Sequence, residues 1–130
     1  MIHGLNHVTV RAPRPLLDQV KDFYCDVLGL VVGPRPPFGG FGWWLYPAGS
    51  DRAAVHLFEQ SSDDSRTLDG INTFDHFAFD ASGRADVEAL LAERGIGFRR
   101  SNVPERTTIQ VFCEDPAGNT VELVFENAES

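Results

Sequence analysis

The chain has 130 residues, of which 42% are hydrophobic, and it carries a formal net charge of -8 at pH 7. This length suits one ordinary domain with its own core, and no apolar run approaches the roughly 20 residues of a membrane-spanning helix. The negative charge disfavours nucleic acids and anionic membrane surfaces as partners. The first residues lack a basic segment followed by an apolar core, so we expect a cytoplasmic protein.

The first half of the sequence predicts one strand, one helix and three further strands. Residues 4–11 form a strand in which His7, Thr9 and Arg11 share one face, because side chains alternate along a strand. Apolar residues spaced by three and four predict a helix over 16–28. Further strands are predicted at 30–33, 41–46 and 53–59, with a Pro- and Gly-rich loop at 34–40.

The second half predicts the same order of elements. Residues 61–70 are polar and rich in Ser and Asp, and we interpret them as the linker between the halves. The elements that follow are strands at 74–79, 98–103, 107–113 and 120–125 and a helix at 84–94. The turn at 115–119 contains Pro, Gly and Asn, which suit a tight connection.

Three elements of the two halves match, namely the first strands, the helices and the last strands. Both halves open with an apolar residue followed by Asn or Asp and then His, which is His7 in the first half and His76 in the second. Alignment of the last strands places His56 opposite Glu122 in the sequence. The offsets are 69 and 66 residues. A nearly constant offset indicates an internal repeat, so the order β-α-β-β-β occurs twice.

Two βαβββ modules predict an α+β fold. Each module leaves one face of its sheet without a helix, so we expect the two sheets to enclose a cleft, with the helices on the outside. We predict a single domain over residues 1–130, with the first module at 1–60, the linker at 61–70 and the second module at 71–127.

Four candidate metal ligands lie at the paired positions of the repeat. A pseudo-twofold axis would bring His7 opposite His76, and His56 opposite Glu122. Three imidazoles and one carboxylate suit a divalent ion such as Zn, Fe, Ni, Co or Mn, and they leave two octahedral positions open for substrate oxygens. Taken singly, each His would more often be a hydrogen-bonded core residue. The remaining His3 is interpreted as a surface residue.

Aromatic residues are predicted to line the cleft. Trp44, Tyr46 and Phe58 suit an aromatic or planar small-molecule substrate, although ordinary core packing is an equal alternative. Arg11 shares a strand face with His7 and is a candidate substrate-binding residue. Three other arginines are interpreted as solvated surface charges: Arg99, Arg100 and Arg106.

The two cysteines, Cys25 and Cys113, have neither a disulfide-framework spacing nor a zinc-site spacing. We interpret them as buried free thiols in a reducing compartment.

A resemblance to a known family rests on four motifs, which are Asn6–Val10, Phe23–Leu30, Asp75–Phe79 and Asp115–Leu123. With these motifs the chain resembles the vicinal oxygen chelate superfamily over about residues 4–126. That superfamily includes glyoxalase I, fosfomycin-resistance thiol transferases, extradiol dioxygenases, methylmalonyl-CoA epimerase and bleomycin-resistance proteins. It hosts several chemistries on one scaffold, so the resemblance is more specific for the fold than for the reaction.

The resemblance implies metal ligands at His7, His56, His76 and Glu122. It also implies that the metal acts as a Lewis acid on two neighbouring oxygens of the substrate. Many members of the family are dimers, so we expect a homodimer, with the two modules pairing within one chain or between chains.

Lyase or isomerase chemistry of the glyoxalase type is the leading hypothesis, with Glu122 as the base. The glyoxalase pattern has a carboxylate where His56 stands, so His56 is a ligand or an acid-base group here. An extradiol dioxygenase is the second hypothesis, although its pattern has a Tyr where this chain has Phe112. A fosfomycin-type thiol transferase is a third. A drug-binding protein is a fourth, and bleomycin-binding relatives lack the metal ligands that this chain keeps.

Overall fold

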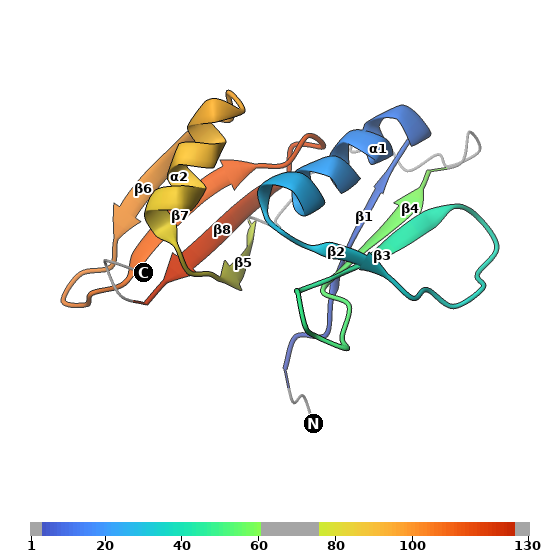
Figure 1. The fold of residues 1–130 in the computed structure, drawn as a ribbon, viewed down its shortest axis with the longest axis horizontal. Coiled ribbons are helices and arrows are strands. Elements are labelled where there is room, and N and C mark those ends of the chain that lie inside the picture. Colours follow the sequence, from blue (N-terminus) through green and yellow to red (C-terminus); the bar gives the residue numbers. More distant parts are fainter. Residues whose placement is uncertain (1–3, 61–75, 127–130) are drawn as a thin grey trace, which may run out of the picture. The chain divides into compact units, whose positions relative to one another are not determined.

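The computed structural model describes residues 4–60 and 76–126. The chain divides into two compact units, Met1–Arg66 and Thr67–Ser130, and each is described here by itself (Figure 1). The predicted linker at 61–70 lies outside the described residues, as does His3. Among the described residues, the helices lack the length and the hydrophobicity of a membrane-spanning segment.

The first unit is a four-stranded sheet with one helical segment against it. Its strands lie in the order β1-β4-β3-β2, with β1 parallel to β4 and the other neighbours antiparallel. The elements in chain order are β1 (Val8–Ala12), α1 (Arg14–Asp22), a π-helical turn (η1, Phe23–Val27), β2 (Val31–Gly33), β3 (Gly42–Tyr46) and β4 (Val55–Glu59).

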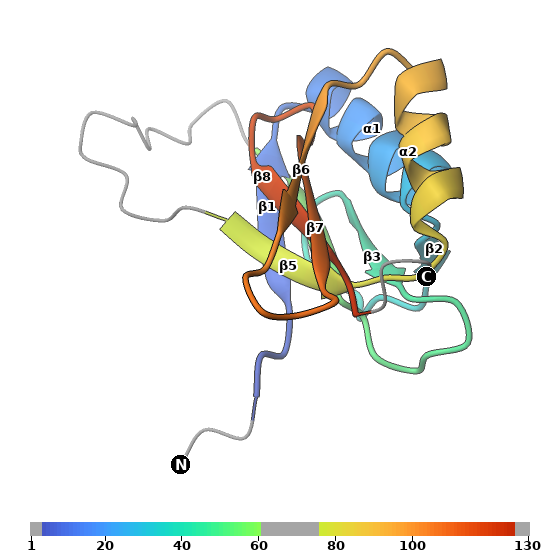
Figure 2. The same ribbon diagram turned by 90° about the vertical axis from the view of Figure 1, so that its left-hand side faces the viewer.

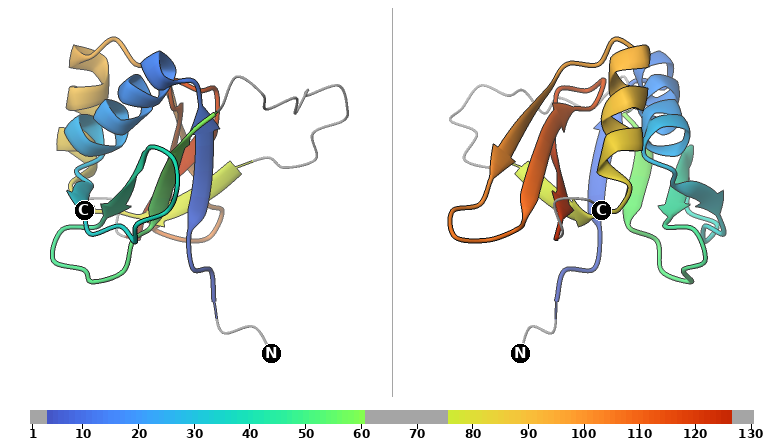
Figure 3. Two further views of the ribbon diagram at one scale, coloured as in Figure 1. Left: turned by 90° about the vertical axis from the view of Figure 1, so that its right-hand side faces the viewer. Right: turned by 60° about the vertical axis from the view of Figure 1, so that its left-hand side comes forward.

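The helical segment of the first unit covers one face of its sheet (Figure 3). Leu17, Val20 and Tyr24 are fully buried, which is the apolar stripe that the sequence spacing predicts. The predicted helix over 16–28 is present, but its last part is the π-helical turn rather than α-helix. The chain leaves this turn through Gly29, which has a φ of 78° that favours glycine.

The second unit repeats this arrangement. Its strands lie in the order β5-β8-β7-β6, with β5 parallel to β8 and the other neighbours antiparallel. The elements are β5 (His76–Asp80), α2 (Arg84–Glu93), β6 (Phe98–Asn102), β7 (Ile109–Glu114) and β8 (Thr120–Phe125). The α2 helix lies along the sheet of its own unit (Figure 2), with Leu91 fully buried.

The α+β class and the duplicated βαβββ order are therefore confirmed. Every predicted strand is present among the described residues, with ends that differ by a few positions. The first strand begins at Val8, so His7 lies one residue before it. That the two sheets enclose a cleft stays a prediction.

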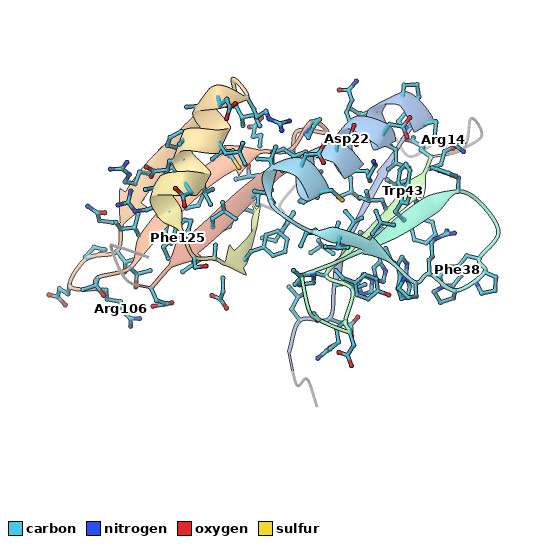
Figure 4. The ribbon with its side chains drawn as sticks, in the orientation of Figure 1. Arg14, Asp22, Phe38, Trp43, Arg106 and Phe125 are labelled. Atoms are coloured by element: carbon cyan, nitrogen blue, oxygen red, sulfur yellow. The ribbon has the colours of Figure 1, made fainter. Side chains whose placement is uncertain are left out.

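Register places the candidate residues of the first unit beside one another. His56 on β4 pairs with Thr9 of β1 on one side and with Trp44 of β3 on the other. His7 is two residues before Thr9 and therefore belongs to the same side of the sheet. Trp43 lies on the opposite side, close to α1, where its ring is 5.6 Å from Lys21 Nζ (Figure 4).

The second unit uses the same register. Glu122 on β8 pairs with Ala78 of β5 and with Phe112 of β7. His76 is two residues before Ala78, as His7 is two residues before Thr9. The repeat seen in the sequence is thus a repeat of strand register, and in each unit it places one His near the second candidate ligand.

Candidate functional site

A stack of three rings contains both candidate ligands of the first unit. The centroid of the His56 ring lies 3.9 Å from that of the Trp44 ring, with an interplanar angle of 8°. On its other side the centroid of the His7 ring lies 3.8 Å away, with an interplanar angle of 15°. His56 is 8% exposed, whereas His7 is exposed at the end of the stack. His7 Nδ1 is 2.8 Å from Asn6 Oδ1. The stack therefore holds His56 rigidly and leaves one face of His7 open.

The surroundings of His56 keep its imidazole neutral. Burial lowers the pKa of His56 from its ordinary value of 6.5, and the neighbouring His7 lowers it further. A neutral imidazole keeps a nitrogen lone pair, which a metal ligand or a general base needs. His56 can act in either role near pH 7.

The stacked rings do not yet point to a common centre. A metal ion lies close to the plane of each imidazole that binds it, and two nearly parallel rings direct their lone pairs along parallel planes. His7 is the exposed member of the pair. One ion could therefore bind both nitrogens only after the His7 ring turns.

The second unit joins its two candidate ligands directly. His76 Nε2 is 2.9 Å from Glu122 Oε2. Gln110 donates a hydrogen bond from its side-chain nitrogen to the other oxygen, Glu122 Oε1. Glu122 is buried, whereas the side chain of His76 is 33% exposed, so the pair lies at the edge of the buried region. Phe112 packs its ring edge to face with His76, with 5.6 Å between the centroids.

Gln110 has no counterpart in the first unit. Its equivalent there is Gly42, two residues before Trp44 as Gln110 is two residues before Phe112. A Cβ at Gly42 would lie 2.0 Å from the carbonyl oxygen of Leu57, so no side chain fits. The two units therefore hold their candidate ligands differently, by ring stacking in the first and by hydrogen bonds in the second.

The chemistry of the donor set fits a divalent metal ion of the Zn, Fe, Ni, Co or Mn type. Two donors are adjacent in each unit, and His56 is kept neutral, as a ligand must be. Among the described residues, no group of three or more His, Cys, Asp or Glu side chains is already placed to hold an ion. Ligation by His76 and Glu122 together would replace the hydrogen bond between them, because Nε2 would then offer its lone pair. That all four residues share one ion stays a prediction.

A small pocket of about 190 Å³ lies next to the ring stack. It is lined by Asn6, Trp44, Tyr46, Asp51, Arg52, Ala53 and His56. Two of the predicted substrate-binding residues, Trp44 and Tyr46, therefore border the same pocket as His56. The Tyr46 hydroxyl donates a hydrogen bond to the carbonyl oxygen of Pro34.

The other two predicted substrate-binding residues lie farther along the same sheet face. Phe58 is two residues after His56 on β4, and the Arg11 guanidinium carbon is 5.9 Å from the centre of the Phe58 ring. Phe38 lies in the loop between β2 and β3 and packs against both Phe58 and Trp44. The centroid of its ring is 6.1 Å from that of Phe58 and 6.0 Å from that of Trp44. The aromatic residues thus form one continuous surface on this face.

Three residues of this region were missed by the sequence reasoning. Gln110 could have been found, because strand alternation places it on the same face as Phe112, next to Glu122. Phe38 and Arg35 lie in a Pro- and Gly-rich loop, where no periodicity indicates which side chain turns inwards.

Both cysteines are free thiols, as predicted. Cys113 is buried, whereas Cys25 is only partly buried, so the prediction that both are buried is wrong for Cys25. Cys25 lies on the π-helical turn between the buried positions of that segment. Neither thiol belongs to the ring stack or to the hydrogen-bonded group of His76, Gln110 and Glu122.

Solved structures share this fold at low sequence identity. A protein from Bacillus anthracis described as a glyoxalase family protein has a TM-score of 0.72 at 21% identity, with 98% of both chains covered. A lactoylglutathione lyase from Agrobacterium tumefaciens has a TM-score of 0.63 at 23% identity, covering 94% of this chain and 92% of that one. An antibiotic binding protein from Streptomyces sp. CB03234 has a TM-score of 0.64 at 22% identity, covering 97% of this chain and 100% of that one. A search of curated proteins found no match.

A family model matches almost the whole sequence. It is the model of the Glyoxalase/Bleomycin resistance protein/Dioxygenase superfamily, and it covers residues 4–123. This range includes both pairs of candidate ligands, the aromatic surface and both βαβββ modules. The chain belongs to the Glyoxalase/Bleomycin resistance protein/Dioxygenase superfamily.

Proposed function

We propose that the chain is a metal-dependent enzyme of this superfamily that acts on a small oxygenated organic molecule by lyase or isomerase chemistry. His7, His56, His76 and Glu122 are the proposed ligands of one divalent ion. The observation that carries this proposal is the repeated register, in which each unit places a His beside the second candidate ligand. Four residues with unrelated structural roles would not produce the same pairing twice.

In this proposal the ion, when bound, would act as a Lewis acid on two adjacent oxygens of the substrate. Glu122 would accept a proton from the carbon next to the substrate carbonyl and return it to the neighbouring carbon. Its carboxylate is suited to this step because Gln110 holds one oxygen, Oε1, and fixes the orientation of the group also when His76 turns its nitrogen to the ion. Trp44 covers one face of His56 and keeps water from it.

Two features bear on the alternatives. Phe112 pairs with Glu122 across β7 and β8 and has no hydroxyl, so a ring-cleaving dioxygenase would lack a donor at this position. The parallel stack of His7, His56 and Trp44 favours a drug-binding protein as the second candidate. Stacked rings bind planar aromatic molecules without metal, and one structural neighbour is named as an antibiotic binding protein.

Metal analysis of the full chain distinguishes an enzyme from a binder. The protein is stripped with a chelator and reconstituted in turn with Zn, Fe(II), Ni, Co and Mn, and the bound metal is measured by mass spectrometry. We expect about one equivalent of a preferred metal, and its loss in His7→Ala, His76→Ala and Glu122→Ala. His3→Ala is the control, since the sequence places His3 outside the repeated pairs.

Less than a tenth of an equivalent of every metal, unchanged by the ligand substitutions, would remove the enzyme proposal and favour the drug-binding candidate. If metal binds, the reaction class is tested next. Isomerisation of a 2-oxoaldehyde hemithioacetal supports the leading proposal, whereas oxygen consumption with a catechol and Fe(II) supports a dioxygenase. The proposed homodimer is tested separately, by sedimentation of the metal-loaded protein.

A further inference from the structure

Arg35 is held on the aromatic face of the first unit. It lies in the loop between β2 and β3, with its guanidinium carbon 5.1 Å from the centre of the Phe58 ring and 5.4 Å from that of Phe38. One terminal nitrogen, Nη1, donates a hydrogen bond of 3.3 Å to the carbonyl oxygen of Gly40, in the same loop. Cation–π contact and this hydrogen bond together fix the plane of the guanidinium.

Two donors of this guanidinium have no partner. Arg35 Nε and Nη2 are buried and form no hydrogen bond with any described residue. No described carboxylate forms an ion pair with Arg35. Buried polar groups are nearly always hydrogen bonded, and a buried charge without a partner destabilises the folded state. The two donors therefore indicate an acceptor that binds there.

Elsewhere in the chain, the same two nitrogens of another arginine bind a carboxylate. Arg100 donates from Nε to Glu88 Oε1 at 2.8 Å and from Nη2 to Glu88 Oε2 at 2.6 Å. Nε and Nη2 lie on one edge of a guanidinium, and they form a fork whose spacing matches the two oxygens of a carboxylate or phosphate. Arg35 has the same pair of nitrogens without an acceptor.

The Arg35 fork belongs to the face that carries the candidate site. Phe58, which packs against Arg35, shares a face of β4 with His56. Phe38 contacts both Phe58 and Trp44, and Trp44 stacks on His56. A continuous aromatic surface therefore runs from the Arg35 fork to the ring stack.

We propose that Arg35 binds the anionic oxygens of a small ligand, a carboxylate, phosphate or phosphonate attached to a planar apolar body that lies on Phe38, Phe58 and Trp44. The identification of this ligand as the substrate rests on the proposed function. Because Nε and Nη2 are covered, the loop over 34–40 moves aside when the ligand enters. Gly40, whose carbonyl oxygen accepts the hydrogen bond from Arg35 Nη1, has a φ of 98°. Glycine adopts this backbone conformation readily, whereas other residues rarely do.

The test uses the metal-free full chain and four probes of similar size. Benzoate and phenylphosphonate carry the anionic group, and benzamide and benzyl alcohol are neutral controls. Binding is followed by the amide spectrum and by the Nε–H resonance of Arg35, which is assigned as the signal lost in Arg35→Lys. Arg35→Met removes the charge, and Arg94→Met is the matched control on an exposed arginine of the second unit.

We expect both anionic probes to shift the Arg35 Nε–H resonance and the neutral probes to leave it in place. Arg35→Met and Arg35→Lys should each weaken binding of the anions by on the order of tenfold or more, because Lys lacks the fork. Arg94→Met should bind like the original chain. Without ligand, Arg35→Met should unfold at the same temperature as the original chain or a higher one, because it removes a half-buried charge with two covered donors that no described residue accepts from.

The proposal is overturned if no probe moves the Nε–H resonance at millimolar concentration, or if Arg35→Met binds the anions as well as the original chain does. It is also overturned if Arg35→Met lowers the unfolding temperature and leaves anion affinity unchanged, which is the result of a purely structural role. Failure of the proposed function is separate, since it appears as absent metal binding while the anions still bind through Arg35. A stronger response to phenylphosphonate than to benzoate assigns the anion to the phosphonate or phosphate class.

Discussion

Gln110 donates a hydrogen bond to the Glu122 oxygen that is not bonded to His76, so the buried carboxylate is held at both oxygens. The bond runs from β7 to β8 within the second unit. Groups that orient a ligand are often nearly as important for metal affinity as the ligand itself. Gln110 is therefore a positioning residue for the proposed metal ligand Glu122.

We predict that Gln110→Leu weakens metal binding by roughly tenfold to a hundredfold, the range for loss of an outer-shell partner. The substitution keeps a side chain of similar size and removes only the donor. The measurement is a competition titration with a chromophoric chelator. Gln19→Leu, on the exposed side of α1, is the control. Equal metal affinity in the original chain and in Gln110→Leu would contradict a positioning role.

The Trp44 ring stacks on the His56 ring, with 3.9 Å between the ring centroids. Burial is the main cause of the lowered pKa of His56. We predict that Trp44→Leu raises the pKa of His56 towards the ordinary value of 6.5, because a smaller side chain exposes the ring to water. The pKa is read from the imidazole proton shifts during an NMR titration of the metal-free chain. Trp43→Leu alters the neighbouring tryptophan on the other face of β3, so it should leave the His56 titration in place. An equal response to both substitutions would show that overall loosening, and not the stacking ring, sets this pKa.

The duplicated fold could be predicted because its signals are local. Alternation gave the strands, spacing of three and four gave the helices, and repetition of a His after Asn or Asp gave the pairing of the halves. The structure adds the strand register. His7 lies two residues before Thr9, which pairs with His56, and His76 lies two residues before Ala78, which pairs with Glu122. These features depend on neighbours within a few residues or on one repeated pattern.

The rest depends on contacts that no local pattern encodes. The stacking of His56 between His7 and Trp44 is set by side-chain rotation after the strands have paired. The contact of the Arg35 guanidinium with the Phe58 ring depends on the path of the loop over 34–40, whose sequence has no hydrophobic periodicity. The sequence pattern predicts that Arg100 is a surface charge, and Arg100 is indeed exposed, but no local pattern indicates that it also pairs with Glu88.

The two thiols should differ in reactivity. Burial, helped by the neighbouring Asp115, raises the pKa of Cys113 to about 11, and Cys113 is 4% exposed. At pH 8 only about one Cys113 in a thousand is then a thiolate, the form that reacts. Burial also raises the pKa of Cys25, which is more accessible. We therefore predict slow alkylation of Cys25 in the native protein and much slower alkylation of Cys113.

Mass spectrometry after timed exposure to iodoacetamide measures both rates, and the Cys25→Ser variant isolates the signal of Cys113. The Cys113 rate should rise about tenfold for each pH unit up to about pH 11. Denaturant should make both thiols react quickly. A Cys113 that reacts in the native state as fast as it does in denaturant would contradict the burial described here.

Glu88 on α2 forms an ion pair with Arg100 on β6 and so links the helix to the strand. It forms a second ion pair with Arg84, one turn earlier in the helix. The hydrogen bonds from Arg100 are the main cause that holds the pKa of Glu88 below its ordinary value of 4.5. A carboxylate whose pKa is lowered by folding stabilises the protein at pH values above its ordinary pKa. That contribution is lost as the pH falls below about 4.5 and through the lowered pKa, because the unfolded chain then takes up the proton more readily.

We predict that Glu88→Gln lowers the unfolding temperature at pH 7 by a few degrees, and that the difference from the original chain shrinks as the pH falls below 4.5. Thermal unfolding followed by circular dichroism between pH 3 and pH 7 measures both effects on the full chain. Glu93→Gln, at an exposed position near the end of the same helix, controls for the change in net charge. A loss of stability in Glu88→Gln that stays constant down to pH 3 would mean that side-chain packing, rather than the charge on Glu88, links the helix to the strand.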